Sequence, residues 1–445
     1  MYAWHQMTVR IFFVLFLGLC ARGVSAVLPI EQWTTQAGTR VYFVAARALP
    51  MLDIRIDVDA GARFDPTNKQ GLAALTATLL AAGVTAKDAQ LTLSEGEIAD
   101  GFANVGAQYF VYTDADHSSV HLRCLSAPAQ RDSALALLKR VLHHPDFPED
   151  KVQRDIQISV AALRENLTRA DTVADRALLP AIYGTHPYGQ LPSIESIGHI
   201  TRQDVSRFYR ERYGANRAVI TLVGDIDQTQ ARALAERLSQ SLPSFASEIN
   251  LPAVSALSGK GATLRFTHPS EQAYIMIGQP GITHHDPDYF ALLVGNHILG
   301  GGGFTSRLVE EVREKRGLSY SVHSFFSPWL QSGVFEISLQ TRKDQADQTL
   351  QVVRQTLTTF VEQGPTAKEL QAAKDYLINS FPLRIDSNAK LLANVANFAW
   401  HGLPLNYLDT WSTHIAQVSL AQVKAALARH LQPQAMVTVV VGSAQ

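Results

Sequence analysis

The chain has 445 residues, too many for one ordinary hydrophobic core, so we expect two or more domains. Hydrophobic residues make up 46% and charged residues 18% of the sequence, a globular composition that excludes a disordered or fibrous protein. The formal net charge of -1 shows no excess of basic residues, so the sequence predicts no nucleic-acid partner.

The first 26 residues predict a secretory signal peptide. Arg10 supplies a positive charge, residues 11–20 form an apolar run, and Val24 and Ala26 match the small residues of a cleavage site. The apolar run is too short to span a bilayer, which takes about 20 residues. A buried N-terminal helix is the alternative. We expect cleavage after Ala26, export to a bacterial periplasm, and no membrane span in the mature chain.

Further along the chain, apolar runs predict a mixture of strands and long helices. Runs typical of strands lie at 39–46, 52–61, 109–113, 273–279 and 333–341. Runs with helical periodicity lie at 71–83, 130–142, 150–167, 287–299, 304–316, 344–363, 366–380 and 386–400. Because strands and helices do not alternate strictly, the pattern favours an α+β fold over a doubly wound sheet.

An internal repeat indicates two matching halves. Segments 200–224 and 418–442 each predict an amphipathic helix, a turn and an apolar strand, and they start and end 218 residues apart. Thr201 and Ser419 stand where the helix N-caps belong. A repeat of this length indicates two homologous domains. The segment between them is rich in Ser, Pro and Gly. We therefore predict an N-terminal domain at 27–243, a linker at 244–261 and a C-terminal domain at 262–445.

Three segments resemble the pitrilysin/insulinase-type metallopeptidase family. They are AGARFDPTNKQGLAALTATLLAAG (60–83), HPYG (186–189) with the following 193–213, and ILGGGGFTSRLVEEVREKRGLSYSV (298–322). They occur in the family's order and, with the repeat, extend the resemblance over the mature chain. The resemblance implies two α+β domains, each an antiparallel-rich sheet covered by helices, facing each other across a substrate chamber.

The sequence departs from this family at the metal. Active members carry H-x-x-E-H on the first helix after the Gly-Leu pair, with two histidines as zinc ligands and the glutamate as base. Here the corresponding residues are Ala74, Ala77 and Thr78. The family's third ligand falls near Asp155, and a single carboxylate cannot hold zinc. The sequence therefore predicts that this chain binds no catalytic metal.

Arg313 and Tyr320 match a second functional pair of the family. Arg313 falls at the end of the helix predicted over 304–316. Tyr320 falls near the start of a strand predicted over 318–326, on the same face as the apolar residues two before and two after it. In the family such a pair polarises the peptide carbonyl and stabilises its tetrahedral intermediate, since both side chains donate hydrogen bonds. The alternative is structural, with Arg313 paired to a neighbour such as Glu310 and Tyr320 packed on a sheet.

A run of four glycines, Gly300, Gly301, Gly302 and Gly303, precedes this pair. It lacks the Lys-Ser/Thr that a phosphate-binding P-loop requires, which argues against nucleotide binding. The run resembles the glycine-rich loop in the non-catalytic subunit of mitochondrial processing peptidase, and the resemblance implies contact with substrate. A tight turn before a helix is the alternative.

Two functions fit these observations. In the first, the chain is the non-zinc subunit of an exported heteromeric metallopeptidase acting on peptides: a homologous partner carries the zinc, and this chain, without a cofactor of its own, supplies Arg313 and Tyr320. In the second, it is a catalytically inactive structural or peptide-binding module of the same family. The presence of both donors favours the first function.

Overall fold

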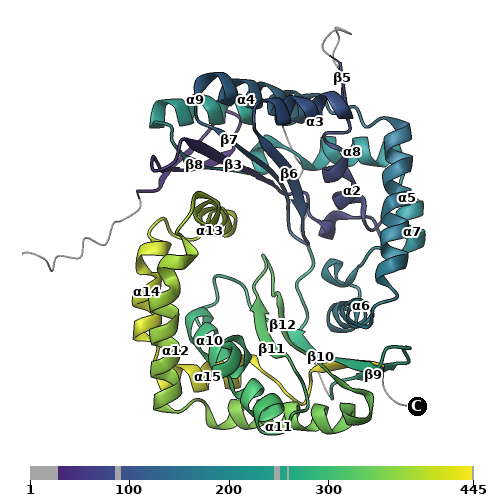
Figure 1. The fold of residues 1–445 in the computed structure, drawn as a ribbon, viewed down its shortest axis with the longest axis vertical. Coiled ribbons are helices and arrows are strands. Elements are labelled where there is room, and N and C mark those ends of the chain that lie inside the picture. The colour runs from purple at the N-terminus through teal and green to yellow at the C-terminus, as the bar shows by residue number, and fades with distance from the viewer. Residues whose placement is uncertain (1–28, 86–91, 245–250, 258–259, 443–445) are drawn as a thin grey trace, which may run out of the picture.

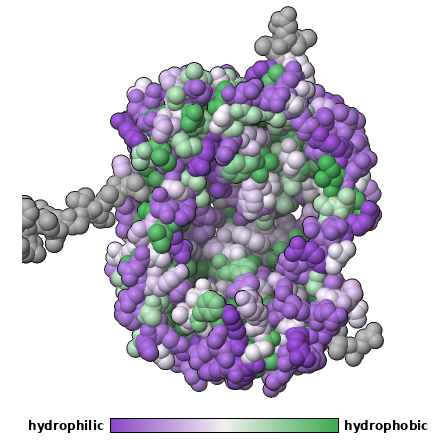
Figure 2. Space-filling model, viewed as in Figure 1, coloured by the Kyte–Doolittle hydropathy of each residue, from purple (hydrophilic) through white to green (hydrophobic). Residues whose placement is uncertain are grey.

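The computed structural model describes residues 29–85, 92–244, 251–257 and 260–442 (Figure 1). The predicted signal peptide and part of the predicted linker lie outside these residues. Each half of the chain forms one large sheet with helices packed around it, and the space-filling view is hollowed where the two halves meet (Figure 2). In the described part of the chain, no helix combines the length and the apolar character needed to cross a bilayer.

The N-terminal half is built on a six-stranded sheet in the order β1-β2-β8-β3-β7-β6. All neighbours in this sheet are antiparallel except β2 and β8, which are parallel. The strands are β1 (Glu31–Thr34), β2 (Arg40–Ala45), β3 (Met51–Val58), β6 (Gln108–Thr113), β7 (Ser118–Leu125) and β8 (Ala218–Gly224). A short hairpin, β4 (Gly83–Val84) with β5 (Leu93–Ser94), lies apart from this sheet.

The C-terminal half repeats this topology in a five-stranded sheet, β11-β12-β10-β13-β9. Its order matches β6-β7-β3-β8-β2, including the single parallel pair, here β9 with β13. The strands are β9 (Thr263–Phe266), β10 (Gln272–Pro280), β11 (Val322–Ser327), β12 (Val334–Arg342) and β13 (Val437–Val441). The shared topology confirms the predicted α+β fold with two homologous halves, and β6 and β11 are equivalent edge strands.

The repeated segments have the predicted structure. Helix α8 (Arg202–Arg212) precedes β8, and helix α15 (Leu420–His430) precedes β13. The side chains of Thr201 and Ser419 each accept a hydrogen bond from a backbone N–H in the first turn of these helices. In both halves the apolar strand of the repeat is an inner strand of the sheet, which explains its continuous apolar sequence.

In addition, one helix from each half packs on the sheet of the other half (Figure 1). Helix α13 (Asn388–His401) of the C-terminal half packs on β8 and β3 through an apolar cluster that includes Val395 and Phe398. Helix α6 (Ala170–Tyr183) of the N-terminal half packs on β10 and β13 through Leu178 and Ile182. This exchange fixes how the two sheets face each other. The other α-helices of the described residues are α2 (Leu72–Leu79), α3 (Glu95–Asn104), α4 (Pro128–His143), α5 (Glu149–Asn166), α7 (Ile194–Gly198), α9 (Gln228–Ser239), α10 (Tyr289–Asn296), α11 (Ala346–Gln363), α12 (Ala367–Ser380) and α14 (Tyr407–Gln417).

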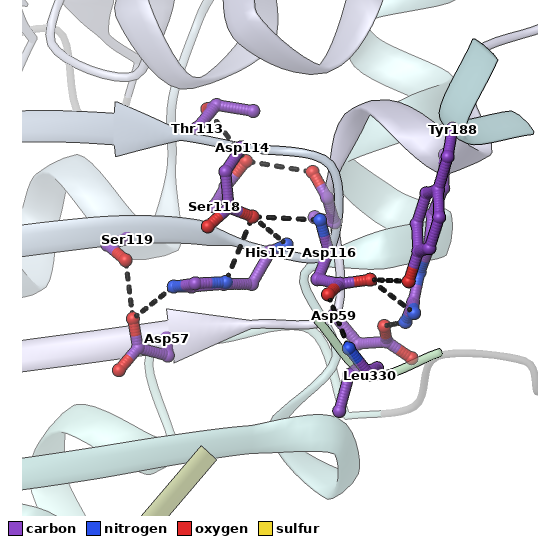
Figure 3. A network of polar contacts seen from close by, with 12 residues as sticks. Asp57, Asp59, Thr113, Asp114, Asp116, His117, Ser118, Ser119, Tyr188 and Leu330 are labelled. Carbon is purple, nitrogen blue, oxygen red and sulfur yellow. Dashed lines mark hydrogen bonds and ion pairs between the residues drawn. The ribbon is translucent and has the colours of Figure 1, made fainter. Parts of the chain in front are cut away.

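A buried polar network ties the halves together (Figure 3). The Asp116 carboxylate of the N-terminal half accepts hydrogen bonds from the hydroxyl of Tyr188 at 2.6 Å and from the backbone N–H of Leu330, in the C-terminal half, at 2.8 Å. Arg63 forms ion pairs with Asp116 and Asp59. Because these groups are buried, their hydrogen bonds hold the loop around Leu330 against the N-terminal sheet.

His117 adds a charged contact at the same seam (Figure 3). Its Nδ1 lies 3.1 Å from Asp114 and its Nε2 lies 3.3 Å from Asp57, while its ring packs on Trp400 of α13 with 4.7 Å between centroids. Burial alone would lower the pKa of His117, but the two carboxylates outweigh burial and raise the pKa to about 9. Burial alone would raise the pKa of the Asp57 carboxyl, but the neighbouring Arg55 and His117 outweigh burial and lower that pKa to about 2. The raised pKa favours the protonated form of His117 between the two carboxylates, although Arg55 Nη2 also lies 2.8 Å from its Nε2.

Candidate functional site

Helix α2 carries the altered zinc motif. Ala74 and Thr78, four residues apart, are exposed on one face of the helix, as the motif's spacing predicts, and Ala77 is buried. Neither alanine offers a ligand atom, and the Thr78 hydroxyl donates a hydrogen bond to the Ala74 carbonyl oxygen at 3.0 Å. Asp155 on α5 is buried and its carboxylate lies 2.7 Å from Arg154 Nε. None of these side chains presents a free set of zinc ligands.

A different group of possible metal ligands was not predicted from the sequence. Asp286, Asp288 and His430 lie close enough together to hold an ion. His430 Nε2 lies 2.9 Å from Asp288 and 3.5 Å from Asp286, and Arg429 also forms an ion pair with Asp288. These contacts already tie the start of α10 to the end of α15. The aspartates and His430 are more than 140 positions apart, so no local sequence signal could have revealed the group.

The structure confirms part of the predicted surroundings of Arg313 and corrects those of Tyr320. The helix predicted over 304–316 is shorter and irregular: a 3₁₀ turn, Gly303–Thr305, comes first, and the helical residues 307–308 continue into a π-helical segment, Val309–Glu314. Strand β11 begins only at Val322, so Tyr320 precedes it. Tyr320 is 84% exposed, whereas the apolar residues Leu318 and Val322 are buried. The prediction that these three side chains share one face was wrong, because an irregular segment replaces the first residues of the strand.

Arg313 and Tyr320 nevertheless lie together. The guanidinium carbon of Arg313 is 4.8 Å from the centre of the Tyr320 ring and 4.6 Å from the centre of the Phe304 ring. Its Nε also lies 3.4 Å from the carboxylate of Glu314, not that of Glu310. Two hydrogen-bond donors of different kinds, a planar cation and a phenol, are therefore adjacent and accessible. Such a pair can stabilise negative charge that develops on an oxygen atom.

The glycine run has a steric explanation. A Cβ atom on Gly300 would lie 2.6 Å from the backbone nitrogen of Ser324, and one on Gly302 would lie 2.6 Å from the carbonyl oxygen of His297. A Cβ atom on Gly301 would lie 2.8 Å from the side-chain amide nitrogen of Asn296. Gly303 has a left-handed φ of 60°, which glycine adopts without strain. Because these positions carry no side chains, the π-helical turn His297–Gly301 can pass directly over β11. The chain then reverses direction at Gly303.

A cavity of about 560 Å³ lies beside this run. Gly300, Gly301 and Gly303 line it together with Arg313, Tyr320 and apolar side chains of α10 and β11. Gly302 is not among the lining residues. Because β11 is the edge strand of its sheet, one side of its backbone has no neighbouring strand in the described sheet. An apolar groove along such an edge is the geometry that accepts an extended peptide.

Comparisons with known proteins identify the family. The model of insulinase (peptidase family M16) matches residues 45–191, and the model of the peptidase M16 inactive domain matches residues 199–377. A solved structure described as a peptidase M16 inactive domain from Pseudomonas fluorescens is 37% identical. It overlaps 94% of this chain and 99% of that chain with a TM-score of 0.87.

This chain belongs to the insulinase-type M16 peptidase family. It is also similar to a Helicobacter pylori protein named non-peptidase homolog YmxG, with 28% identity over 94% of both chains. Its fold matches the periplasmic protease PqqL from Escherichia coli at 16% identity with a TM-score of 0.77, over 93% of this chain and 45% of that one. The predicted family is thus confirmed, and this M16 chain lacks the ligands for a catalytic zinc of its own.

Proposed function

We propose that this chain is the zinc-free subunit of an exported two-subunit M16 peptidase, and that it contributes Arg313 and Tyr320 to a partner's zinc site. The observation that carries the proposal is the placement of this pair. An arginine and a tyrosine lie adjacent at the edge of an apolar groove, and the tyrosine is 84% exposed, so its hydroxyl is open to solvent. The fold does not need an exposed phenol there, whereas an oxyanion site does.

The altered α2 helix supports a division of labour between two chains. Ala74, Ala77 and Thr78 leave no metal on which Arg313 and Tyr320 could act within this chain. This chain matches 45% of PqqL, so the PqqL chain is about twice as long as this one. A dimer of this chain with a homologue would bring together two units of this length in a comparable way. The zinc and the general base would then come from a homologue with an intact H-x-x-E-H motif.

The groove beside β11 supports a peptide as the substrate. Its apolar lining and the neighbouring strand edge fit an extended backbone. Gly300, Gly301 and Gly303 line the groove, and a Cβ atom on Gly303 would meet nothing within 4 Å, so the missing side chain there keeps the groove open. The residues 1–26 support export, and the domain boundaries 27–243 and 262–445 remain part of this proposal. The second candidate function, a peptide-binding module without catalysis, is favoured by the same groove and needs neither Arg313 nor Tyr320.

Capture of the partner tests the proposed assembly. We expect the tagged mature chain, purified from the periplasm of its native host, to recover a homologue that carries H-x-x-E-H, with an interface above about 1,000 Å². The Arg313→Ala variant should recover the same homologue, because the proposal gives Arg313 a role in catalysis and none in assembly. A monodisperse monomer, found even when the chain and that homologue are co-expressed, would contradict the proposal.

A further inference from the structure

Phe304 is an exposed aromatic residue that the sequence analysis did not single out. It follows the glycine run directly, in the 3₁₀ turn Gly303–Thr305, and 72% of its surface is exposed. The left-handed φ of Gly303 reverses the chain immediately before it. The glycine run that crosses β11 is therefore followed directly by one large ring, which lines the groove.

The ring of Phe304 lies over the guanidinium of Arg313. The distance from the guanidinium carbon to the ring centre is 4.6 Å, slightly shorter than the 4.8 Å to Tyr320. Arg313 extends from an irregular π-helical segment, and its one ion-pair neighbour there, Glu314, is itself more than half exposed. An exposed ion pair of this kind restrains an arginine weakly, whereas an aromatic face attracts the cation and limits the orientations of its plane.

We propose that Phe304 is a positioning residue that holds the Arg313 guanidinium ready to act beside Tyr320. This inference rests on the proposed function. Tyr320 must direct its hydroxyl toward the reacting oxygen, so it is not free to serve only as a support. Phe304 carries no polar group and supplies the second ring. A donor that is already oriented stabilises charge in the transition state without reorganising, so the loss of Phe304 affects kcat more than KM.

The first test uses the isolated chain and needs no partner. Side-chain Nε–H relaxation of Arg313 is measured by NMR, with the signal assigned by its absence in Arg313→Lys. We expect Phe304→Leu to make the Arg313 side chain markedly more mobile and Phe304→Tyr, which keeps the ring, to leave it ordered. Phe266→Leu is the matched control, because it makes the same substitution at the opposite edge strand, β9. An unchanged order of Arg313 in Phe304→Leu would overturn the proposal, whatever the activity.

The second test measures kcat and KM of the complex reconstituted with the zinc-bearing homologue. We expect Phe304→Leu to lower kcat roughly two- to fivefold, the magnitude of an exposed cation–π contact, with KM nearly unchanged and with rescue by Phe304→Tyr. If Arg313 loses its order in Phe304→Leu while kcat stays at the wild-type value, the ordering role of Phe304 is upheld and the catalytic role of Arg313 in the proposed function is rejected.

Discussion

In the assembled peptidase, Tyr320→Phe is expected to lower kcat by a factor of roughly 10²–10³, as the loss of other oxyanion donors does, and to change KM only slightly. A zinc-bound hydroxide that attacks a peptide carbonyl builds negative charge on the carbonyl oxygen. The phenol of Tyr320 would donate to that oxygen mainly in the transition state, so its removal affects the chemical step more than substrate binding. The substitution deletes one hydroxyl from an 84% exposed side chain, so the fold and the ring over Arg313 are preserved.

Two further variants make this result specific. Tyr376→Phe also removes an exposed hydroxyl from the C-terminal half, but its ring contacts His297 rather than Arg313, and we expect its kcat to stay near the wild-type value. Arg313→Lys keeps the charge and loses the planar fork, so we expect it to lower kcat as well. If Tyr320→Phe and Arg313→Ala both retain wild-type kcat in an intact complex, the chain is a scaffold or a peptide-binding module.

The second large effect is expected at the seam between the halves. His117→Ala should lower the free energy of unfolding by about 3 kcal/mol at pH 6, because it removes a buried cation and leaves two carboxylates with one fewer positive partner. The raised pKa of His117, about 9 against an ordinary 6.5, indicates a similar magnitude by linkage. Loss of the Trp400 contact adds a smaller packing effect.

The pH dependence of this effect has a defined sign. A group whose pKa is raised by folding stabilises the protein fully below its unfolded pKa, here about 6.5, and that stabilisation is lost as the pH rises through the folded value of about 9. Urea titrations at pH 6 and pH 10 should therefore show a large difference between His117→Ala and the wild type at pH 6 and a much smaller one at pH 10. His121→Ala is the comparison: its ring stacks on Phe110 and burial lowers its pKa to about 4, so we expect the opposite trend, a smaller loss of stability at pH 6 than at pH 10. A difference that does not depend on pH would contradict the assignment of a buried charge.

Much of the fold could be predicted because local and global signals agree. The repeated helix and strand were visible as capped, periodic segments, and Thr201 and Ser419 cap their helices as expected. The lost zinc motif was equally clear, because Ala74 and Ala77 cannot ligate a metal in any fold. The strand order within each sheet and the exchange of α6 and α13 were not predictable, since they depend on contacts between distant segments.

The site was predicted less completely. Arg313 and Tyr320, singled out by their spacing, lie together in the structure, but helical periodicity over 304–316 concealed a 3₁₀ turn and a π-helical segment. Gly300 and Gly302, just before these segments, lie so close to neighbouring backbone that no Cβ atom would fit there, and this packing had no signal in the sequence. The contact of Phe304 with Arg313 depends on this irregular path and had no signal in the sequence.

Peptide cleavage by three samples tests the central claim most directly: the mature chain alone, the homologue with the intact zinc motif alone, and their equimolar mixture, each analysed in parallel for zinc. We expect far less than one zinc and no cleavage for this chain alone, zinc with weak cleavage for the homologue alone, and rapid cleavage that chelators abolish for the mixture. Stoichiometric zinc with chelator-sensitive cleavage in this chain alone, or a mixture no faster than the homologue by itself, would contradict the account.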